Sequence, residues 1–169
     1  TQTGQSNPFM LQPSVLSEQG GISLANLGNG ASVAWCDYDM DGDLDILITG
    51  DNQTRIYRND GSNIFTEQNG ILLPGTWQGS AAWGDYDNNG YPDILITGES
   101  SNGKISKVYR NSGMNTFTEQ TGIQLPGISN GSASWVDYNK DGRLDISLAG
   151  NGTNGALTRL FRNAGNNVF

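Results

Sequence analysis

The sequence predicts an all-β protein built from β-propeller blades, and three observations support this prediction. The chain contains 24 glycines and only 15% charged residues, which is typical of turn-rich β proteins. One segment occurs three times, with its tryptophans 48 and 52 residues apart, at Trp35, Trp83 and Trp135. Each copy has four short strand patterns, and four strands at this period are typical of a propeller blade. A β-solenoid coil would be shorter, and a β-sandwich would not repeat one motif three times.

The expected strands follow in the same order in each copy. The first carries the tryptophan, as in SAAWGD, and is expected to place it in the core. After an aspartate-rich loop, the second is an apolar run such as LDILITG. The third alternates apolar and polar residues, as in TRIYRN, and a turn rich in Asn and Gly leads to the fourth, FTEQ. We expect blades at residues 17–65, 66–117 and 118–169, within a repeat region of 15–169, and an arm or linker at 1–14.

The aspartate-rich loop poses a problem of charge. Residues 37–45 read DYDMDGDLD, with five aspartates among nine residues. Repulsion between such carboxylates is on the order of 1–4 kcal/mol per pair, and a bound divalent cation removes it. Position 6 of the loop is always glycine, and position 7 varies, as expected if it contributes only its backbone carbonyl. The ligand candidates at positions 1, 3, 5, 7 and 9 are Asp37, Asp39, Asp41, Asp43 and Asp45; Asp85, Asp87, Asn89, Tyr91 and Asp93; and Asp137, Asn139, Asp141, Arg143 and Asp145.

This all-oxygen donor set favours Ca²⁺ over Mg²⁺ or zinc. An EF-hand is excluded, because Ile48, Ile96 and Leu148 occupy the position where that loop requires glutamate. Of the 17 acidic residues, 11 lie in the three loops, and three Ca²⁺ ions would change the formal charge from −8 to −2. We therefore predict three structural calcium sites. Asn89 and Asn139 reduce the ligand charge of the second and third loops, so we expect the first loop to bind most tightly.

The stretch WGDYDNNGYPDILITG and its two copies resemble FG-GAP/VCBS-type repeats, which form the calcium-binding blades of integrin α-subunit propellers and of many secreted propellers. The resemblance covers residues 15–169. It implies a calcium-binding propeller at the cell surface or in the extracellular space. It names no ligand, because the calcium loop is specific for the family and uninformative about function.

Both ends of the repeat region are incomplete in complementary ways. Closed propellers normally have at least four blades. The segment VLSEQ, from Val15 to Gln19, matches the IFTEQ of residues 64–68, whereas the last copy stops at Phe169 before its own TEQ. We expect this strand to complete a blade in a neighbouring chain at the open edge near Phe169, giving a homo-oligomer. A segment of a longer propeller is the alternative.

The rim opposite the calcium loops varies between the copies, as binding loops do. It carries three candidate glycosylation sites, Asn52, Asn130 and Asn151. Trp77 breaks the repeat, since its counterpart in the third copy is Ser129, and it is a candidate ligand-contact residue. Packing beneath the linker is the alternative for this side chain.

We expect a non-enzymatic extracellular module that acts as a structural or adhesion scaffold. The net charge of −8 argues against nucleic acid, and no apolar run approaches the roughly 18 residues of a membrane span. The chain contains no histidine, and its acids outside the loops form no evident pair, which argues against an enzyme. The alternatives are a lectin-like glycan-binding propeller and a fragment of a propeller polysaccharide lyase or hydrolase.

Overall fold

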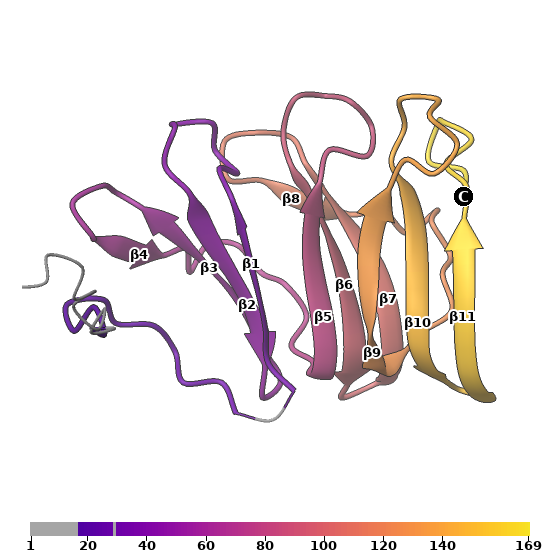
Figure 1. Ribbon diagram of the computed structural model, residues 1–169, viewed down its shortest axis with the longest axis horizontal. Helices are drawn as coiled ribbons and strands as arrows, with labels where there is room; N and C mark the ends of the chain where they lie inside the picture. The colour runs from indigo at the N-terminus through magenta and orange to yellow at the C-terminus, as the bar shows by residue number, and fades with distance from the viewer. Residues whose placement is uncertain (1–16, 29) are drawn as a thin grey trace, which may run out of the picture.

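The computed structural model describes residues 17–28 and 30–169, and in this part of the chain it contains strands, turns and irregular segments without helix (Figure 1). The predicted fold class is confirmed, because three separate antiparallel sheets follow one another along the chain as propeller blades do. Within the described residues, no helix meets the length and hydropathy needed to cross a membrane.

The three sheets share one meander topology in which strands adjacent in sequence pair with each other. The first sheet has the order β1 (Ser32–Cys36), β2 (Asp45–Gly50), β3 (Gln53–Asn59) and β4 (Phe65–Glu67). The second has the order β5 (Trp77–Gly84), β6 (Asp93–Ser100), β7 (Gly103–Asn111) and β8 (Phe117–Glu119). The third contains β9 (Ser129–Val136), β10 (Asp145–Gly152) and β11 (Gly155–Phe161).

The ends of the blades differ in detail from the expected unit boundaries. The boundaries expected after residues 65 and 117 fall inside β4 and β8, because these short strands pair with β3 and β7 of the same sheet. In the third unit only Phe169 corresponds to these strands, and the sheet has three strands. The expected arm at 1–14, and residues 15 and 16 of the expected strand at 15–19, lie outside the described residues. Residues 17–19 of that segment are described and form no strand.

Two hydrophobic clusters join neighbouring sheets face to face. Between the first and second sheets, Leu47 and Ile56 pack against Ile94 and Ile96. Each of these four side chains is at most 2% exposed. Burial of one such side chain contributes about 1.5–3 kcal/mol relative to leaving it in water. An equivalent cluster joins the second and third sheets and contains Leu95, Val108, Ile128, Ile146 and Leu148. The middle strands are therefore buried on both faces, as their continuous apolar sequence predicts.

The repeated tryptophans differ in their surroundings, which corrects the expectation that all three are core residues. Trp83 and Trp135 are partly buried and pack against the two clusters between sheets. Trp35 is 54% exposed, because its face of the first sheet points away from the second sheet. Among the described residues, the buried cluster on that face packs with Leu24, Ala25, Leu27 and Phe65. Sequence periodicity cannot reveal this difference, since it depends on which neighbour covers the sheet.

The connections alternate between two rims, as the antiparallel order requires. The aspartate-rich loops that follow β1, β5 and β9 lie at one end of the sheets, at the top of Figure 1. The turns that follow β2, β6 and β10 lie at the other end. The two rims therefore present two kinds of site.

Candidate metal centres

Each aspartate-rich loop turns sharply because two of its residues adopt left-handed backbone conformations. The glycine at position 6 has φ of 99° in the first loop, 90° in the second and 83° in the third. The residue at position 4 is also left-handed, with φ of 66° for Met40, 56° for Asn88 and 59° for Lys140. Glycine adopts this region without steric penalty, which explains why position 6 is the same in all three loops.

The turns bring three carboxylates together in each of the first two loops. One carboxylate oxygen from each of Asp37, Asp39 and Asp45 lies within 4.8 Å of the other two. Asp85, Asp87 and Asp93 form the same arrangement in the second loop. Calcium–oxygen distances are about 2.3–2.6 Å, so two oxygens that bind one ion lie at most about 5 Å apart. Positions 1, 3 and 9 therefore have the spacing of ligands for a common ion.

Backbone amides orient the first and last carboxylates of the loop. In the first loop the amides of Asp41 and Gly42 donate to the two oxygens of Asp37, each at 3.0 Å. The amide of Tyr38 donates to Asp45 Oδ2 at 3.0 Å, and that of Asn59 donates to Asp45 Oδ1 at 2.8 Å. The same four bonds recur in the second loop. Asp45 thus links its own loop to the end of β3.

Two buried carboxylate oxygens in these loops have no hydrogen-bond partner, which supports a hard cation as the missing partner. They are Asp39 Oδ1 in the first loop and Asp145 Oδ2 in the third. An unpaired buried carboxylate oxygen is costly, and a bound cation would compensate it. The chemistry of the donors, carboxylates with backbone carbonyls nearby, fits Ca²⁺.

Burial also disfavours the charged carboxylates in the absence of a cation. Burial is the largest cause that raises the pKa of Asp45 to about 6, and repulsion from Asp39 and Asp41 adds to it. Burial likewise raises the pKa of Asp93 to about 7, with repulsion from Asp87 and Asp85. A divalent cation among these groups would reverse both effects and hold the carboxylates ionised.

The remaining predicted ligands are placed differently. Asp41, at position 5, lies outside the group of three, and its Oδ1 accepts the amide of Asp43 at 2.9 Å. At position 7 the Tyr91 ring lies against Gly113, in the turn that follows β7. Arg143 at the same position donates from Nε to the carbonyl of Asn163 at 3.0 Å. These side chains extend towards the neighbouring turn, which agrees with a role for position 7 through its backbone alone.

The third loop has a weaker donor set than the other two. Asn139 replaces the aspartate at position 3, and the described residues show no group of three acids here. Arg143 Nη2 lies 2.5 Å from Asp141 Oδ2, and Arg162 lies 3.4 Å from the same oxygen. Two arginines therefore compete with a cation for this carboxylate. Asp137 keeps its two amide donors, so the loop has the same backbone shape.

Sequence reasoning missed the residue at position 2 of each loop. Tyr38 and Tyr86 are each 1% exposed, and each inserts between its own sheet and the next. The sequence contained a signal for this role, since tyrosine occupies position 2 in all three loops. A large aromatic residue repeated in a polar loop indicates that its side chain packs against another part of the protein. The candidate metal ligands at positions 1 and 3 therefore flank the side chain that joins two blades.

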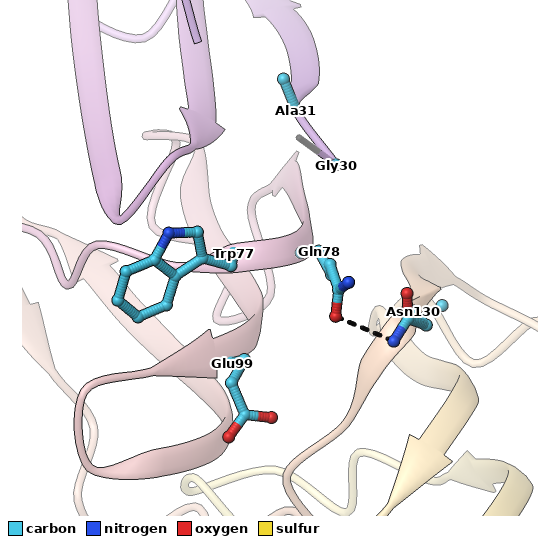
Figure 2. Close-up of a pocket in the computed structure, with 8 residues that line it drawn as sticks. Gly30, Ala31, Trp77, Gln78, Glu99 and Asn130 are labelled. Atoms are coloured by element: carbon cyan, nitrogen blue, oxygen red, sulfur yellow. Dashed lines mark hydrogen bonds between the residues drawn. The ribbon is translucent and has the colours of Figure 1, made fainter. Parts of the chain in front are cut away.

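The opposite rim carries the other predicted residues. Asn52 is exposed in the turn after β2, and Asn151 is exposed near the end of β10. Asn130, near the start of β9, is exposed and donates to Gln78 Oε1 at 2.9 Å. Trp77 is 37% exposed and pairs across the sheet with Glu99. Figure 2 shows Trp77, Gln78, Glu99 and Asn130 around a cavity of about 770 Å³.

The blades and their loops define a class of protein, namely a repeat protein with β-propeller blades that each carry an aspartate-rich loop. The sequence matches the FG-GAP-like repeat family twice, over residues 37–96 and 85–148. These matches span more than half of the chain, which therefore belongs to the FG-GAP-like repeat family. A comparison with curated proteins found no match.

Proposed function

We propose that this chain is a calcium-stabilised propeller module that acts outside cells as a non-enzymatic structural or adhesion scaffold and self-associates. The observation that carries the proposal is the position of the carboxylate groups at the junctions between blades. Asp37 and Asp39 flank Tyr38, which packs on Trp83 of the next blade. A cation in the loop would fix the tyrosine and therefore the junction.

Three calcium ions are proposed, one in each loop. Asp37, Asp39 and Asp45 would hold the first, and Asp85, Asp87 and Asp93 the second. The third would use the weaker set at 137–145. Calcium outside cells is abundant enough to saturate even weak sites, which suits an extracellular location. FG-GAP repeats are typically extracellular, and this supports the same location.

The metal proposal is tested by thermal unfolding and calorimetry in calcium, magnesium and EDTA. We expect calcium to raise the melting temperature and magnesium to have a smaller effect, because Mg²⁺ demands a tighter octahedral shell. Asp45→Asn should remove one binding event. Glu99→Gln, an acid on the opposite rim, is the matched control and should leave calcium binding unchanged. An equal melting temperature in calcium and EDTA would contradict the proposal.

Glycan binding is a second candidate function, favoured by the cavity beside Trp77. A partly exposed indole beside amide and carboxylate groups offers a stacking surface and hydrogen-bond partners for a sugar. Loss of glycan-array binding in Trp77→Ala, with an unchanged melting temperature, would support it. A depolymerisation assay on polysaccharides tests the lyase or hydrolase alternative, and turnover would overturn the non-enzymatic proposal.

A further inference from the structure

The junction between the first and second blades is a specific set of contacts around one tyrosine. The ring of Tyr38 stacks on Trp83, with centroids 5.8 Å apart and an interplanar angle of 10°. Its hydroxyl donates to Asn115 Oδ1 at 2.7 Å, and its backbone carbonyl accepts a hydrogen bond from the side-chain amide of Asn111 at 3.1 Å. Phe117 lies against the ring at 6.0 Å. One residue of the first blade thus contacts four residues of the second.

The same set recurs at the junction between the second and third blades. Tyr86 stacks on Trp135 at 5.7 Å and 6°. Its hydroxyl donates to Asn167 Oδ1 at 2.7 Å, and its backbone carbonyl accepts a hydrogen bond from the side-chain amide of Asn163 at 2.9 Å. Phe169 again lies 6.0 Å from the ring. The two junctions are therefore two copies of one recognition unit.

Within the described residues, one tyrosine and one tryptophan of this repeated set take part in no internal junction. The third tyrosine, Tyr138, is 49% exposed, whereas its two counterparts are each 1% exposed. At the other end Trp35, the counterpart of the two stacking tryptophans, is 54% exposed, and Phe65 lies edge-on beside it at 6.1 Å. Asn59 and Asn63 occupy the positions of the asparagines that bind tyrosine in the internal junctions.

We propose that the Tyr138 face of one copy of this chain docks on the Trp35 face of a second copy and forms the same junction between molecules. The Tyr138 face consists of Tyr138, Ser147 and Leu160, and the Trp35 face consists of Val33, Trp35, Asn59, Asn63 and Phe65. This inference rests on the self-association in the proposed function and names the surfaces that carry it. A second copy is the occupant because each face is the partner that the other one requires, as both internal junctions demonstrate.

The Trp35 face is already arranged as an internal junction is. Leu24 and Leu27 pack with the buried cluster on the same face of the sheet, which includes Ile46 and Ile48. Leu73, the counterpart of Leu24 in the repeat, packs in the same way at the junction between the first and second blades, together with Ile71. The docking surface is therefore preformed, which lowers the entropic cost of association.

The two faces also match in apolar character. Leu160 is 49% exposed, and its counterparts Ile56 and Val108 are at most 2% exposed within the internal junctions. Val33, on the Trp35 face, is 58% exposed, whereas its counterpart Ala81 is 7% exposed in the internal junction. Ser147 replaces the buried leucines of the other blades, so we expect the junction between molecules to be weaker than the internal ones.

The contact is heterologous, because two different surfaces of the chain meet. Two copies could form both contacts and close a ring, or successive copies could extend an open assembly. Either assembly leaves the same prediction for variants, since each molecule supplies both faces.

Sedimentation velocity of the full chain in calcium, over a concentration series, tests the proposal. We expect reversible self-association of the unmodified chain and its loss in both Tyr138→Ala and Trp35→Ala. An equimolar mixture of the two variants should regain a complex of two molecules, because the first keeps an intact Trp35 face and the second an intact Tyr138 face. Met114→Ala, which changes a 96% exposed side chain outside both faces, is the control and should associate normally.

The possible results distinguish failure of this junction between molecules from failure of the proposed function. Association that persists in both single variants would overturn the junction and leave self-association in place. A monomeric unmodified chain at high concentration would overturn both, whereas the calcium-dependent melting shift would still test the scaffold independently. Failure of the mixture to associate, with both variants folded by circular dichroism, would also overturn the junction.

Discussion

Replacement of Asn111 by alanine should weaken the contact between the first two blades. This side chain is 1% exposed and makes three hydrogen bonds. Its amide donates to the carbonyls of Tyr38 and Pro92, each at 3.1 Å, and its Oδ1 accepts the amide of Gly113 at 2.9 Å. Each bond contributes about 1 kcal/mol, and leaving a buried partner unsatisfied adds to the loss. We therefore expect Asn111→Ala to lower the free energy of unfolding by about 3–5 kcal/mol.

Asn59 provides a matched control, because it occupies the same position in the first blade. Its amide donates to the carbonyl of Leu44 at 3.2 Å, and its Oδ1 accepts the amide of Gly61 at 3.1 Å. Both partners belong to its own blade. Two bonds at a partly exposed site predict a loss of about 1–2 kcal/mol for Asn59→Ala.

The measurement is urea unfolding in saturating calcium, at protein concentrations low enough to keep the chain monomeric. The expected difference between the two variants is about 2 kcal/mol, which two-state unfolding curves resolve. Equal losses would refute the reasoning, because they would mean that the bond from Asn111 to the neighbouring blade contributes nothing beyond the local turn.

Three further predictions follow from the loops and the blade contacts. Calcium at about 100 times its dissociation constant should raise the free energy of unfolding by about 2.7 kcal/mol per site, relative to the chain in EDTA. Calorimetry should show that the first loop binds calcium most tightly. Equal affinities at the three loops would contradict this ranking. Because the pKa values of Asp45 and Asp93 are raised to about 6 and 7, each group gives the calcium-free chain a contribution to stability that is fully present below its ordinary pKa of about 4 and is lost as pH rises through the raised value. Urea unfolding in EDTA at about pH 5 and about pH 8 checks the sign, and greater stability at the higher pH would contradict it. Gly84→Ala should cost about 1–3 kcal/mol, because the added Cβ would lie 2.6 Å from Trp135 Cδ1, whereas Gly122→Ala, with open space around it, should be nearly neutral in thermal unfolding.

Much of the metal centre could be predicted from the sequence because it is local. Nine consecutive residues contain the turn and the carboxylates, and the need for a left-handed residue at position 6 follows from the backbone alone. In the first two loops the structure brings the carboxylates at positions 1, 3 and 9 together. It leaves Asp41 outside the group of three, although an oxygen of Asp41 accepts a backbone amide of the same loop just as the oxygens of Asp37 do. Which of the five positions converge depends on the actual path of the turn.

The sequence alone determined the repeat, the strand order and the position of the aspartate-rich loops, because these depend on period, residue type and short-range backbone geometry. The tertiary structure decided how equivalent residues differ. Trp35 is exposed and Trp83 is partly buried, and Tyr138 is half exposed while Tyr86 is buried, although their local sequences are alike. Burial is set by the neighbouring sheet, and the sequence of one blade carries no record of whether another blade covers it.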